Sequence, residues 1–502
     1  MRGPARAARP GGTTVIVPTR TEFRALAAGG RLVPVYRELL ADHETPVSAF
    51  RKIDDGAYGF LLESLEGGEK WGRHSLLGSR PALVFVARGE RCEIHEGGAV
   101  RECPGEPAAE LAALLERHQA VGLPGLPRFC GGAVGYLGYD AVRWFERLPR
   151  RAPDDPGLPD AVFMFSDVVS VFDHFTHNLK VVTHARGGHD PDASWDAAVG
   201  RIDAEVRRLS APLSWSEPEA GEAPGEPRST TTRERYLADA GRALGHVRDG
   251  DVLRVTLAHR LSVPVRRPAF EAYRALRVTS PSPCMHFLRL GDFSLVGSSH
   301  EVLVRRAEDV VEVHPIAGAR PRGRTADEDQ HLEDLLLASD QARAEHVMQV
   351  DLGRSDVGRL SEYGTVETRE LMQVERRSRY IHLVSSVRGR ARAGLRPLEV
   401  VRACFPAGSV SGIPRRRALE IVGELESACR GVYGGAVGHF DYHGNLDLCV
   451  ALRTLVHRGG QAHWGAGAGI AAGTDPEAAW RETLDAGRAL WLAVQQAERG
   501  AP

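Results

Sequence analysis

Hydrophobic residues recur along the chain at two spacings, and each spacing predicts a different element. Over residues 233–247 the apolar positions lie three or four apart, the spacing of one helix face: Tyr236, Leu237, Ala240, Leu244 and Val247. Thr231 and Glu234 have the spacing of a capping box before this helix, and Gly250 follows its end. We therefore predict a helix over residues 233–247.

Three further stretches are expected to be helical. The first is a long helix over residues 326–350, and the second covers residues 418–426. The third begins at Asp475-Pro476, where Asp suits the N-cap and Pro the first helical position, and it ends near residue 498.

The other spacing is strict alternation, which predicts strands. From Val252 to Val263 one face is apolar, and the other face is polar enough to line a cavity: Arg254, Thr256, Ala258, Arg260 and Ser262. Before residue 210, short apolar runs predict clustered strands: Gly59–Leu62, Ala82–Ala87, Gly131–Asp140 and Val162–Phe172. Strands that cluster, instead of alternating with helices, favour an α+β fold over a doubly wound sheet.

One segment differs from the rest in composition. Residues 210–232 are rich in Pro, Gly, Ser and Glu and contain almost no aliphatic side chains, which is typical of a linker or mobile loop. The segment divides the chain into an N-terminal region, residues 13–209, and a C-terminal region, residues 233–498. A length of 502 residues agrees with more than one domain.

The overall composition narrows the classes of protein. Hydrophobic residues make up 42% and charged residues 26%, which argues against extensive disorder. The formal net charge of −2 gives no reason to expect binding to nucleic acid or to an anionic membrane. No apolar run approaches the ~18 residues of a spanning helix, and residues 1–12 lack the apolar stretch of a secretory signal. The seven cysteines have no metal-binding spacing, so we expect free thiols and a cytoplasmic protein.

Three segments have compositions that suit an anionic ligand. Residues 315–324 carry three arginines in a turn-rich loop, which pair well with carboxylate or phosphate, although a solvated basic loop has the same composition. Residues 405–417 place small residues before a helix, where backbone N–H groups bind anions; the alternative is a tight loop that closes on the core. Residues 465–469 follow a strand expected to end at Trp464, and their small side chains leave backbone amides accessible.

Three titratable residues are candidates for chemistry. Glu345 and Glu482 lie on two of the expected helices, and carboxylates are the ligands that Mg²⁺ prefers, although a glutamate in such a position is more often a solvated surface charge. His382 lies in an apolar, strand-like run, where a histidine is either a buried structural residue or an acid–base group. None of these signals is specific alone.

The order of these segments along the chain is more specific than any one of them. Together they resemble the chorismate-utilising enzymes, most closely the large, aminating subunit of anthranilate synthases. The motifs that carry the resemblance cover almost the whole chain: LLESLEGGEKWGRHSLLG (61–78), GGAVGYLGYD (131–140), SPSPCMHFL (280–288), VGSSHEVLVR (296–305), PIAGARPRG (315–323), AEHVMQVDLGRSDVGRL (344–360), HLVSSVRG (382–389), CFPAGSVSGIP (404–414), RGVYGGAVGHFDYHGNLD (430–447), ALRT (451–454) and GAGAGI (465–470).

The resemblance implies a large two-domain α+β fold in which antiparallel sheets sandwich a buried active site. It also implies an enzyme in which Mg²⁺ neutralises the ring carboxylate of chorismate. Ammonia adds at C2 as the C4 hydroxyl leaves, which gives 2-amino-2-deoxyisochorismate, and elimination of pyruvate then gives anthranilate. Ammonia normally comes from glutamine through a glutaminase; no glutaminase domain is visible here, so the resemblance implies a separate subunit and a hetero-oligomer.

The same resemblance assigns roles to individual residues. Glu301 matches the general acid that helps the C4 hydroxyl leave, and His382 matches the histidine of pyruvate elimination. Glu345 and Glu482 match the magnesium ligands. The groups that hold the pyruvyl end of the substrate are matched by Tyr433, Arg453, Gly467, Ala468 and Gly469. A possible feedback site for tryptophan is matched by Glu63, Ser64 and Met285.

Several positions depart from the family pattern. Ala317 replaces the lysine nucleophile of relatives that make 4-amino-4-deoxychorismate, which favours attack by free ammonia. Arg254 stands where relatives that add water carry Lys and aminating relatives carry Gln, and a guanidinium is a very poor base. His300 replaces a Pro beside Glu301. Within the feedback motif, Ser280 and Cys284 replace Asn and Tyr, so tryptophan inhibition is not assured by the resemblance.

The sequence leaves three functions open. The first is synthesis of anthranilate with a glutaminase partner, which retention of His382 favours. The second is an enzyme of a natural-product pathway that stops at 2-amino-2-deoxyisochorismate, and the altered pocket motivates it. The third is a non-catalytic homologue that regulates a glutaminase. It is motivated by Ala342 and Ala479, which stand where relatives often have further Glu residues.

Overall fold

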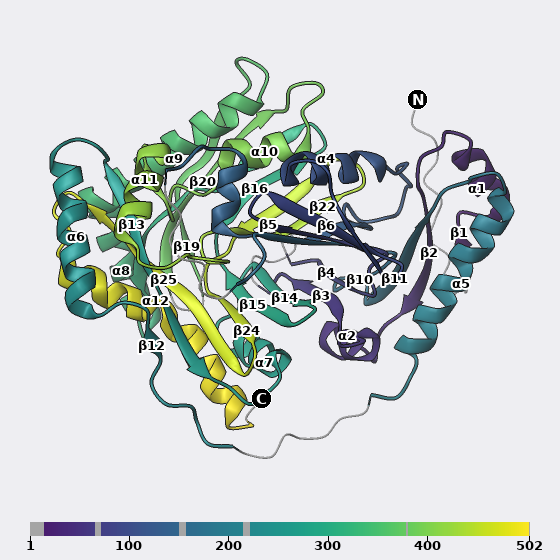
Figure 1. Cartoon of the computed structure of the whole chain (residues 1–502), viewed down its shortest axis with the longest axis horizontal. Coiled ribbons are helices and arrows are strands. Elements are labelled where there is room, and N and C mark those ends of the chain that lie inside the picture. The colour runs from purple at the N-terminus through teal and green to yellow at the C-terminus, as the bar shows by residue number, and fades with distance from the viewer. Residues whose placement is uncertain (1–14, 66–71, 150–156, 214–220, 378–379, 501–502) are drawn as a thin grey trace.

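Two large antiparallel sheets form the centre of the molecule, and helices lie around their periphery (Figure 1). The structure is a computed structural model, and it describes residues 15–65, 72–149, 157–213, 221–377 and 380–500. All strand pairs within the two sheets are antiparallel, and no barrel forms from the described strands. The α+β class expected from the sequence is confirmed.

The first sheet joins strands from both ends of the chain. In spatial order it contains β1 (Ile16–Val17), β2 (Val33–Leu40), β11 (Asn178–Ala185), β10 (Val168–Asp173), β4 (His74–Ser79), β3 (Tyr58–Glu63), β14 (Cys284–Leu290), β15 (Phe293–Ser299), β24 (Thr454–Arg458), β25 (Gln461–Ala471), β13 (Arg254–Pro264) and β12 (Arg228–Ser229), and β21 (Gly412–Ile413) also pairs with β13.

The second sheet has the same mixed origin. Its order is β18 (Ile316–Pro321), β20 (Tyr380–Arg390), β17 (Val310–Val313), β16 (Val302–Ala307), β23 (Leu446–Val450), β22 (Ala436–Asp441), β8 (Gly132–Leu137), β9 (Ala161–Phe165), β5 (Leu83–Arg88), β6 (Arg91–Glu96) and β7 (Ala99–Glu102), and β19 (Glu367–Arg376) pairs with β20.

Both sheets therefore interleave the regions before and after residues 210–232. In the first sheet β3 pairs with β14, and in the second β8 pairs with β22. Part of the intervening segment is itself ordered as a strand, because β12 pairs with β13. Residues 214–220 of the segment lie outside the described part of the chain.

Helices surround the sheets. They are α1 (Arg20–Ala27), α2 (Pro46–Ile53), α4 (Pro107–Arg117), the 3-10 helix η1 (Tyr139–Trp144), α5 (Pro191–Leu209), α6 (Arg233–Arg248), α7 (Ala269–Thr279), α8 (Ala326–Ala338), α9 (Asp340–Leu360), α10 (Pro397–Cys404), α11 (Arg415–Leu425) and α12 (Pro476–Glu498). Helix α12 packs on β25 and on α7, and α9 packs on β20. None of the described helices is long and apolar enough to cross a membrane.

The helices differ from the sequence prediction in two places. The single helix expected over residues 326–350 is wrong, because Ser339 separates α8 from α9. The Ser339 hydroxyl accepts a hydrogen bond from the backbone N–H of Ala342, which starts a new helix. The N-cap of α6 is Thr232, one residue later than expected, and its hydroxyl accepts from the backbone N–H of Arg235.

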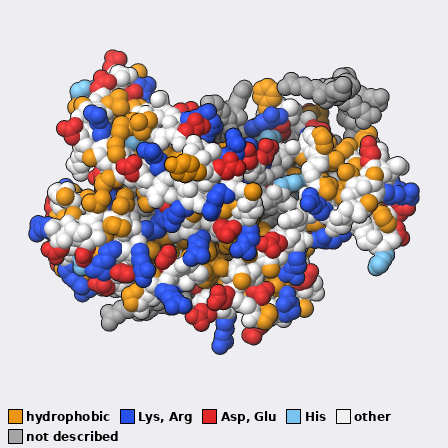
Figure 2. All heavy atoms as spheres, turned by 90° about the horizontal axis from the view of Figure 1, so that it is seen from above, with side chains coloured by type: hydrophobic (Ala, Val, Ile, Leu, Met, Phe, Trp, Pro, Cys, Tyr) orange, Lys and Arg blue, Asp and Glu red, His pale blue; other side chains and the backbone are white. Residues whose placement is uncertain are grey.

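One hydrophobic cluster joins the facing sides of the two sheets. It contains Phe60 and Leu288 from the first sheet and Val134 and Val437 from the second, all of them buried. All seven cysteines are free thiols, as expected. On the face shown in Figure 2, acidic and basic side chains are interspersed, and no continuous basic surface covers that face.

Candidate active site

Glu301 lies where the chain crosses from one sheet to the other. Residue 299 ends β15 in the first sheet and residue 302 begins β16 in the second. The Glu301 side chain is buried, and the Ser409 hydroxyl donates a hydrogen bond of 2.6 Å to its Oε1 atom. Burial raises the pKa of Glu301 to about 7, against the opposing effects of that hydrogen bond and of the cations Arg254 and Arg377. A carboxyl group of this kind can hold a proton near neutral pH.

His382 lies on β20, buried against β18. A bulge in β18 falls at Gly318, whose φ of +70° is a conformation that glycine adopts readily, and the His382 ring hydrogen-bonds to the Gly318 backbone. Burial, followed by the charges of Arg377 and Arg453, lowers the pKa of His382 to about 4. The imidazole is therefore neutral at neutral pH and can accept a proton.

A second histidine covers the ring of His382. The rings of His300 and His382 are nearly parallel, at 15°, with their centroids 5.5 Å apart. Burial, together with the charges of Arg453, His382 and Arg377, keeps the pKa of His300 well below its usual range. Both imidazoles are thus neutral at neutral pH, and the charges of the two neighbouring arginines favour that neutral state.

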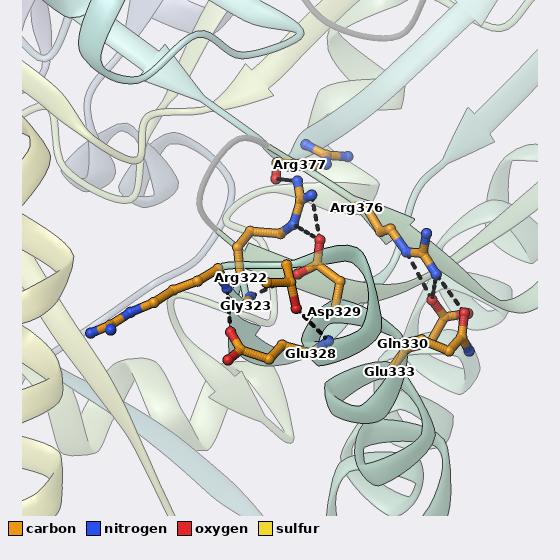
Figure 3. Close-up of polar contacts among 10 residues, drawn as sticks. Arg322, Gly323, Glu328, Asp329, Gln330, Glu333, Arg376 and Arg377 are labelled. Atoms are coloured by element: carbon orange, nitrogen blue, oxygen red, sulfur yellow. Dashed lines mark hydrogen bonds and ion pairs between the residues drawn. The ribbon is translucent and has the colours of Figure 1, made fainter.

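Arg377 directly follows β19 and connects the end of that strand to His300. Its Nη1 donates to the carbonyl of His300 at 2.6 Å, and its guanidinium pairs with Glu375. Figure 3 shows the surrounding contacts: Arg322 donates to the backbone carbonyl of Arg377 and also pairs with Asp329 of α8. The turn-rich loop expected over residues 315–324 is wrong for residues 316–321, which form β18. Arg322 follows this strand directly and forms an ion pair with Asp329.

The glycine-rich segment lies inside β25, so the expected strand end at Trp464 is wrong. Beyond Trp464, β25 pairs with β13 but no longer with β24, and its other edge carries backbone groups without a strand partner in the described chain. A Cβ atom at Gly465 would lie 2.3 Å from atoms of Tyr433, and one at Gly467 would lie 2.8 Å from the Tyr433 hydroxyl. The small residues thus make room for Tyr433 to lie against the strand.

Two of the predicted substrate-binding residues are Tyr433, which lies against this strand, and Arg453, which lies near His382. Burial raises the pKa of Tyr433 to about 12, so its hydroxyl stays protonated and can donate. Arg453 has a φ of +44°, and its guanidinium carbon lies 5.6 Å from the ring centroid of Tyr380, on the strand that carries His382. Its positive charge is one of those that lower the pKa of His382. The remaining predicted residues, Ala468 and Gly469, follow on β25.

Glu345 on α9 and Glu482 on α12 come from distant parts of the chain and lie within electrostatic reach of each other. Burial and the Glu345 carboxylate raise the pKa of Glu482, whereas Arg254 lowers it. Within the described residues, no group of three or more His, Cys, Asp or Glu side chains is arranged to hold a metal ion. A pair of carboxylates nevertheless fits Mg²⁺, which typically takes one or two carboxylates and completes its shell with water and substrate oxygens.

The possible feedback residues form a separate group. Glu63 on β3 lies opposite Met285 on β14, and Ser64 follows β3. The buried Glu63 carboxylate already accepts hydrogen bonds from Arg277 at 2.7 Å and from the Tyr273 hydroxyl. Backbone pairing in the first sheet connects this group to the candidate active site. Met285 lies opposite Ser298, and the backbone N–H of Ser298 donates to the carbonyl of Arg453 at 3.1 Å.

The sequence did not predict the roles of Ser409, which contacts the candidate acid Glu301, or of Arg377, which contacts its neighbour His300. Ser409 lies in the segment interpreted as an anion-binding loop or a tight loop, yet its contacts are made by its hydroxyl and its carbonyl. Its place in that segment was the only available signal. Arg377 follows β19 in a charged stretch, and nothing in the local pattern distinguishes it from its neighbour Arg376.

Comparisons with known proteins define the class. The family model for chorismate binding enzymes matches residues 60–490, and the chain belongs to this family. The chain is 40% identical over 490 residues to anthranilate synthase component 1 of Acetivibrio thermocellus, covering 96% of this chain and 99% of that one. It is 43% identical over 493 residues to anthranilate synthase component 1 of Pseudomonas putida, with the same coverages.

Solved structures agree. Anthranilate synthase component I from Streptococcus pneumoniae superimposes with a TM-score of 0.76 at 30% identity, covering 85% of this chain and 95% of that one. The menaquinone-specific isochorismate synthase of Escherichia coli superimposes with a TM-score of 0.71 at 16% identity, covering 92% of this chain and 94% of that one, which shows a shared fold alone.

Proposed function

We propose that the chain is a magnesium-dependent chorismate aminase that forms 2-amino-2-deoxyisochorismate and then eliminates pyruvate to give anthranilate. The observation that carries the proposal is that a buried carboxyl group, Glu301, and a buried neutral imidazole, His382, both lie near the charge of Arg377. The relatives are named as component 1 of anthranilate synthases, which supports a partner component, and we propose that a separate glutaminase subunit supplies the ammonia. We expect the chain to work in the cytoplasm.

The first half of the reaction needs an acid. Ammonia forms a bond to C2, the ring double bond shifts, and the C4–O bond breaks. Protonated Glu301 donates its proton so that the hydroxyl leaves as water, and its pKa of about 7 keeps that proton available at neutral pH. Ala317 on β18 carries no amine, so the attacking nitrogen is that of ammonia.

The second half needs a base. Neutral His382 takes the ring proton at C2 while the bond between the ring carbon and the ether oxygen breaks, and the ring becomes aromatic. The enolpyruvate that leaves takes up a proton on its CH2 carbon, returned by the imidazolium or by water, and becomes pyruvate. Arg453, Tyr433 and the edge of β25 that has no described strand partner beyond Trp464 hold the pyruvyl end through guanidinium, hydroxyl and backbone N–H donors. Glu345 and Glu482 would hold Mg²⁺, which neutralises the ring carboxylate when bound.

A second product remains a candidate because the surroundings of the acid and base are unusual. His300 covers one face of His382, and Arg254 brings a fixed cation to the pocket. If these residues prevent pyruvate loss, the chain is a 2-amino-2-deoxyisochorismate synthase of a natural-product pathway.

Product analysis tests the proposal. The purified chain is incubated with chorismate, Mg²⁺ and an ammonium salt, products are separated by mass, and pyruvate is assayed. Anthranilate with an equal amount of pyruvate is the expected result. The E301Q variant should no longer form anthranilate, whereas the control E234Q, which changes an exposed glutamate on α6, should form it as the wild type does. An aminated product that retains the enolpyruvyl group would support the second candidate. Unchanged chorismate would refute both.

A further inference from the structure

Two of the seven cysteines meet between the two sheets. Cys284 begins β14 in the first sheet, and Cys449 lies on β23 in the second. Cys449 belongs to the hydrophobic cluster that joins the facing sides of the sheets, and Cys284 packs against that cluster. The hydrogen bond between the two thiols, together with burial, raises the pKa of Cys449 well above its usual range. The two thiols are therefore in contact, although they come from different sheets.

The pairing of the strands explains why these cysteines meet. The chain leaves the first sheet at Ser299, the end of β15, and enters the second at Val302, the start of β16. Cys284 lies opposite Ser299. Cys449 lies opposite Val302. The Ser299 hydroxyl also donates to the carbonyl of Val450 at 2.6 Å, which holds the two sheets together at this point. The two cysteines thus flank the crossing from one sheet to the other.

The two thiols differ in their access to solvent. Cys284 is half-buried, whereas Cys449 is buried, with 6% of its surface exposed. A cysteine reacts with an oxidant as its thiolate, so the raised pKa of Cys449 disfavours direct oxidation of that residue. Cys284 is therefore the thiol that an oxidant from solvent reaches first, and Cys449 is positioned to react with the oxidised Cys284.

We propose that Cys284 and Cys449 are a redox-sensitive pair that hydrogen peroxide closes into a disulfide between the two sheets. The Cys284 sulfur attacks the peroxide, the O–O bond breaks, and Cys284 becomes a sulfenic acid as one water forms. The Cys449 sulfur then attacks the Cys284 sulfur, the S–O bond breaks, and the hydroxyl group leaves with the Cys449 proton as a second water. Each thiol gives up one electron to the peroxide, and a dithiol reductant reverses the oxidation.

The disulfide would act on the segment that carries the candidate acid. Glu301 lies between Ser299 and Val302, within the crossing that the two cysteines flank. Its backbone carbonyl accepts a hydrogen bond of 2.9 Å from the N–H of Val450, the neighbour of Cys449. A covalent bond draws together the strands on both sides of this crossing, and misplacing a catalytic group by about 1 Å can cost about 100-fold in rate. Oxidation should therefore lower turnover. The disulfide is independent of the proposed function, and only this effect on turnover rests on it.

Peptide mapping of the wild-type chain tests the disulfide. The reduced protein is treated with hydrogen peroxide, remaining thiols are alkylated, and the tryptic peptides are weighed without a reductant. Cleavage after arginine releases Cys284 in residues 278–289 and Cys449 in residues 431–453, each as the only cysteine of its peptide. Cys92 and Cys103, which also contact each other, lie in other peptides. The two peptides should be found joined and should separate after dithiothreitol. Separate peptides, whether alkylated or with Cys284 oxidised to the sulfinic acid, would overturn the proposal.

Turnover before and after oxidation tests the effect on the candidate acid. With chorismate, Mg²⁺ and an ammonium salt, the rate of the wild type should fall at least about tenfold on oxidation and return with dithiothreitol. C284S lacks the accessible thiol and should keep its rate under peroxide. C103S changes a half-buried cysteine that follows β7, and this matched control should lose its rate as the wild type does.

The remaining outcomes separate the disulfide from the function. An unchanged rate in a wild-type chain whose two peptides are joined would overturn the effect on Glu301. A C284S protein that loses its rate as the wild type does would assign the loss to another residue and overturn the same effect. If C284S does not fold, peptide mapping of the wild type still decides whether the disulfide forms. A reduced wild-type chain that does not consume chorismate refutes the proposed function, and the mapping, which uses no chorismate, is unaffected.

Discussion

The hydrogen bond from Ser409 to Glu301 gives the sharpest prediction. It is 2.6 Å long and lies in a buried setting, and it lowers the pKa of Glu301 against the effect of burial. The S409A substitution removes the hydroxyl that donates to Glu301. The loop keeps the hydrogen bonds that the carbonyl of residue 409 accepts from Arg254 and Thr256. The pKa of Glu301 should therefore rise above its present value of about 7.

The size of the rise follows from the two protonation states. A hydrogen bond to a charged group contributes about 1.5–3 kcal/mol and one between neutral groups about 0.5–1.5 kcal/mol, so the carboxylate loses about 1–1.5 kcal/mol more than the acid. Because about 1.4 kcal/mol corresponds to one pH unit, the pKa of Glu301 should rise by about one.

The direction of the effect on rate follows from the role of Glu301 as an acid. Its protonated form is lost as pH rises through the pKa, so a higher pKa preserves activity at higher pH. The assay is the steady-state rate with ammonium salt, expressed as the ratio of S409A to wild type from pH 6 to 9, in which the titration of ammonia cancels. The ratio should increase about tenfold across this range. A ratio that stays flat or falls would refute Glu301 as the acid.

Three other predictions follow from contacts in the structure. The E482Q substitution should raise the Mg²⁺ concentration needed for half-maximal turnover by at least about tenfold, since it removes one of two carboxylates, and an unchanged magnesium titration would contradict the metal assignment. The R277A substitution leaves the buried Glu63 carboxylate without its cation and should lower the free energy of unfolding by about 3–5 kcal/mol, measured in urea; an unchanged midpoint would show that Tyr273 alone suffices. The H300A substitution uncovers His382 and should raise the pKa of that imidazole from about 4 towards its ordinary value. Neutral His382 would then be lost at higher pH, so the acidic limb of the pH–rate profile should move up, and an unmoved limb would exclude this effect of His300.

Local patterns predicted those elements whose periodicity is governed by neighbours in sequence. The alternation from residue 252 to 263 corresponds to β13, and the Asp475-Pro476 pair starts α12 as expected. The break between α8 and α9 was not predicted, because Ser339 is tolerated inside a helix and only its capping bond to Ala342 shows that a new helix begins there. The strand through residues 465–471 was also missed, since glycine disfavours strands and β13 supplies the pairing from a distant part of the sequence.

The residue types and motifs of the sequence predicted which residues belong to the candidate site, but they did not predict how those residues contact one another. Nothing in the sequence around Ser409 reveals that its hydroxyl meets Glu301, because 108 positions separate the two residues. The stacking of His300 on His382 likewise depends on a bulge at Gly318 and on Arg377 holding the His300 carbonyl. Such contacts depend on how two sheets pack, which no single-chain periodicity encodes.

The interleaving of the sheets has a consequence for how the chain is made. When residue 209 has left the ribosome, β3 and β8 each have one neighbour, and the strands that cover their other sides, β14 and β22, have not been synthesised. Two central strands therefore have an unpaired edge during translation. Unpaired strand edges are the sites through which β-proteins aggregate with other chains. Cells that produce this protein need to shield those edges for as long as it takes to add more than two hundred residues, the span from residue 209 to β22 at residue 436. A truncated N-terminal region would keep that exposure permanently.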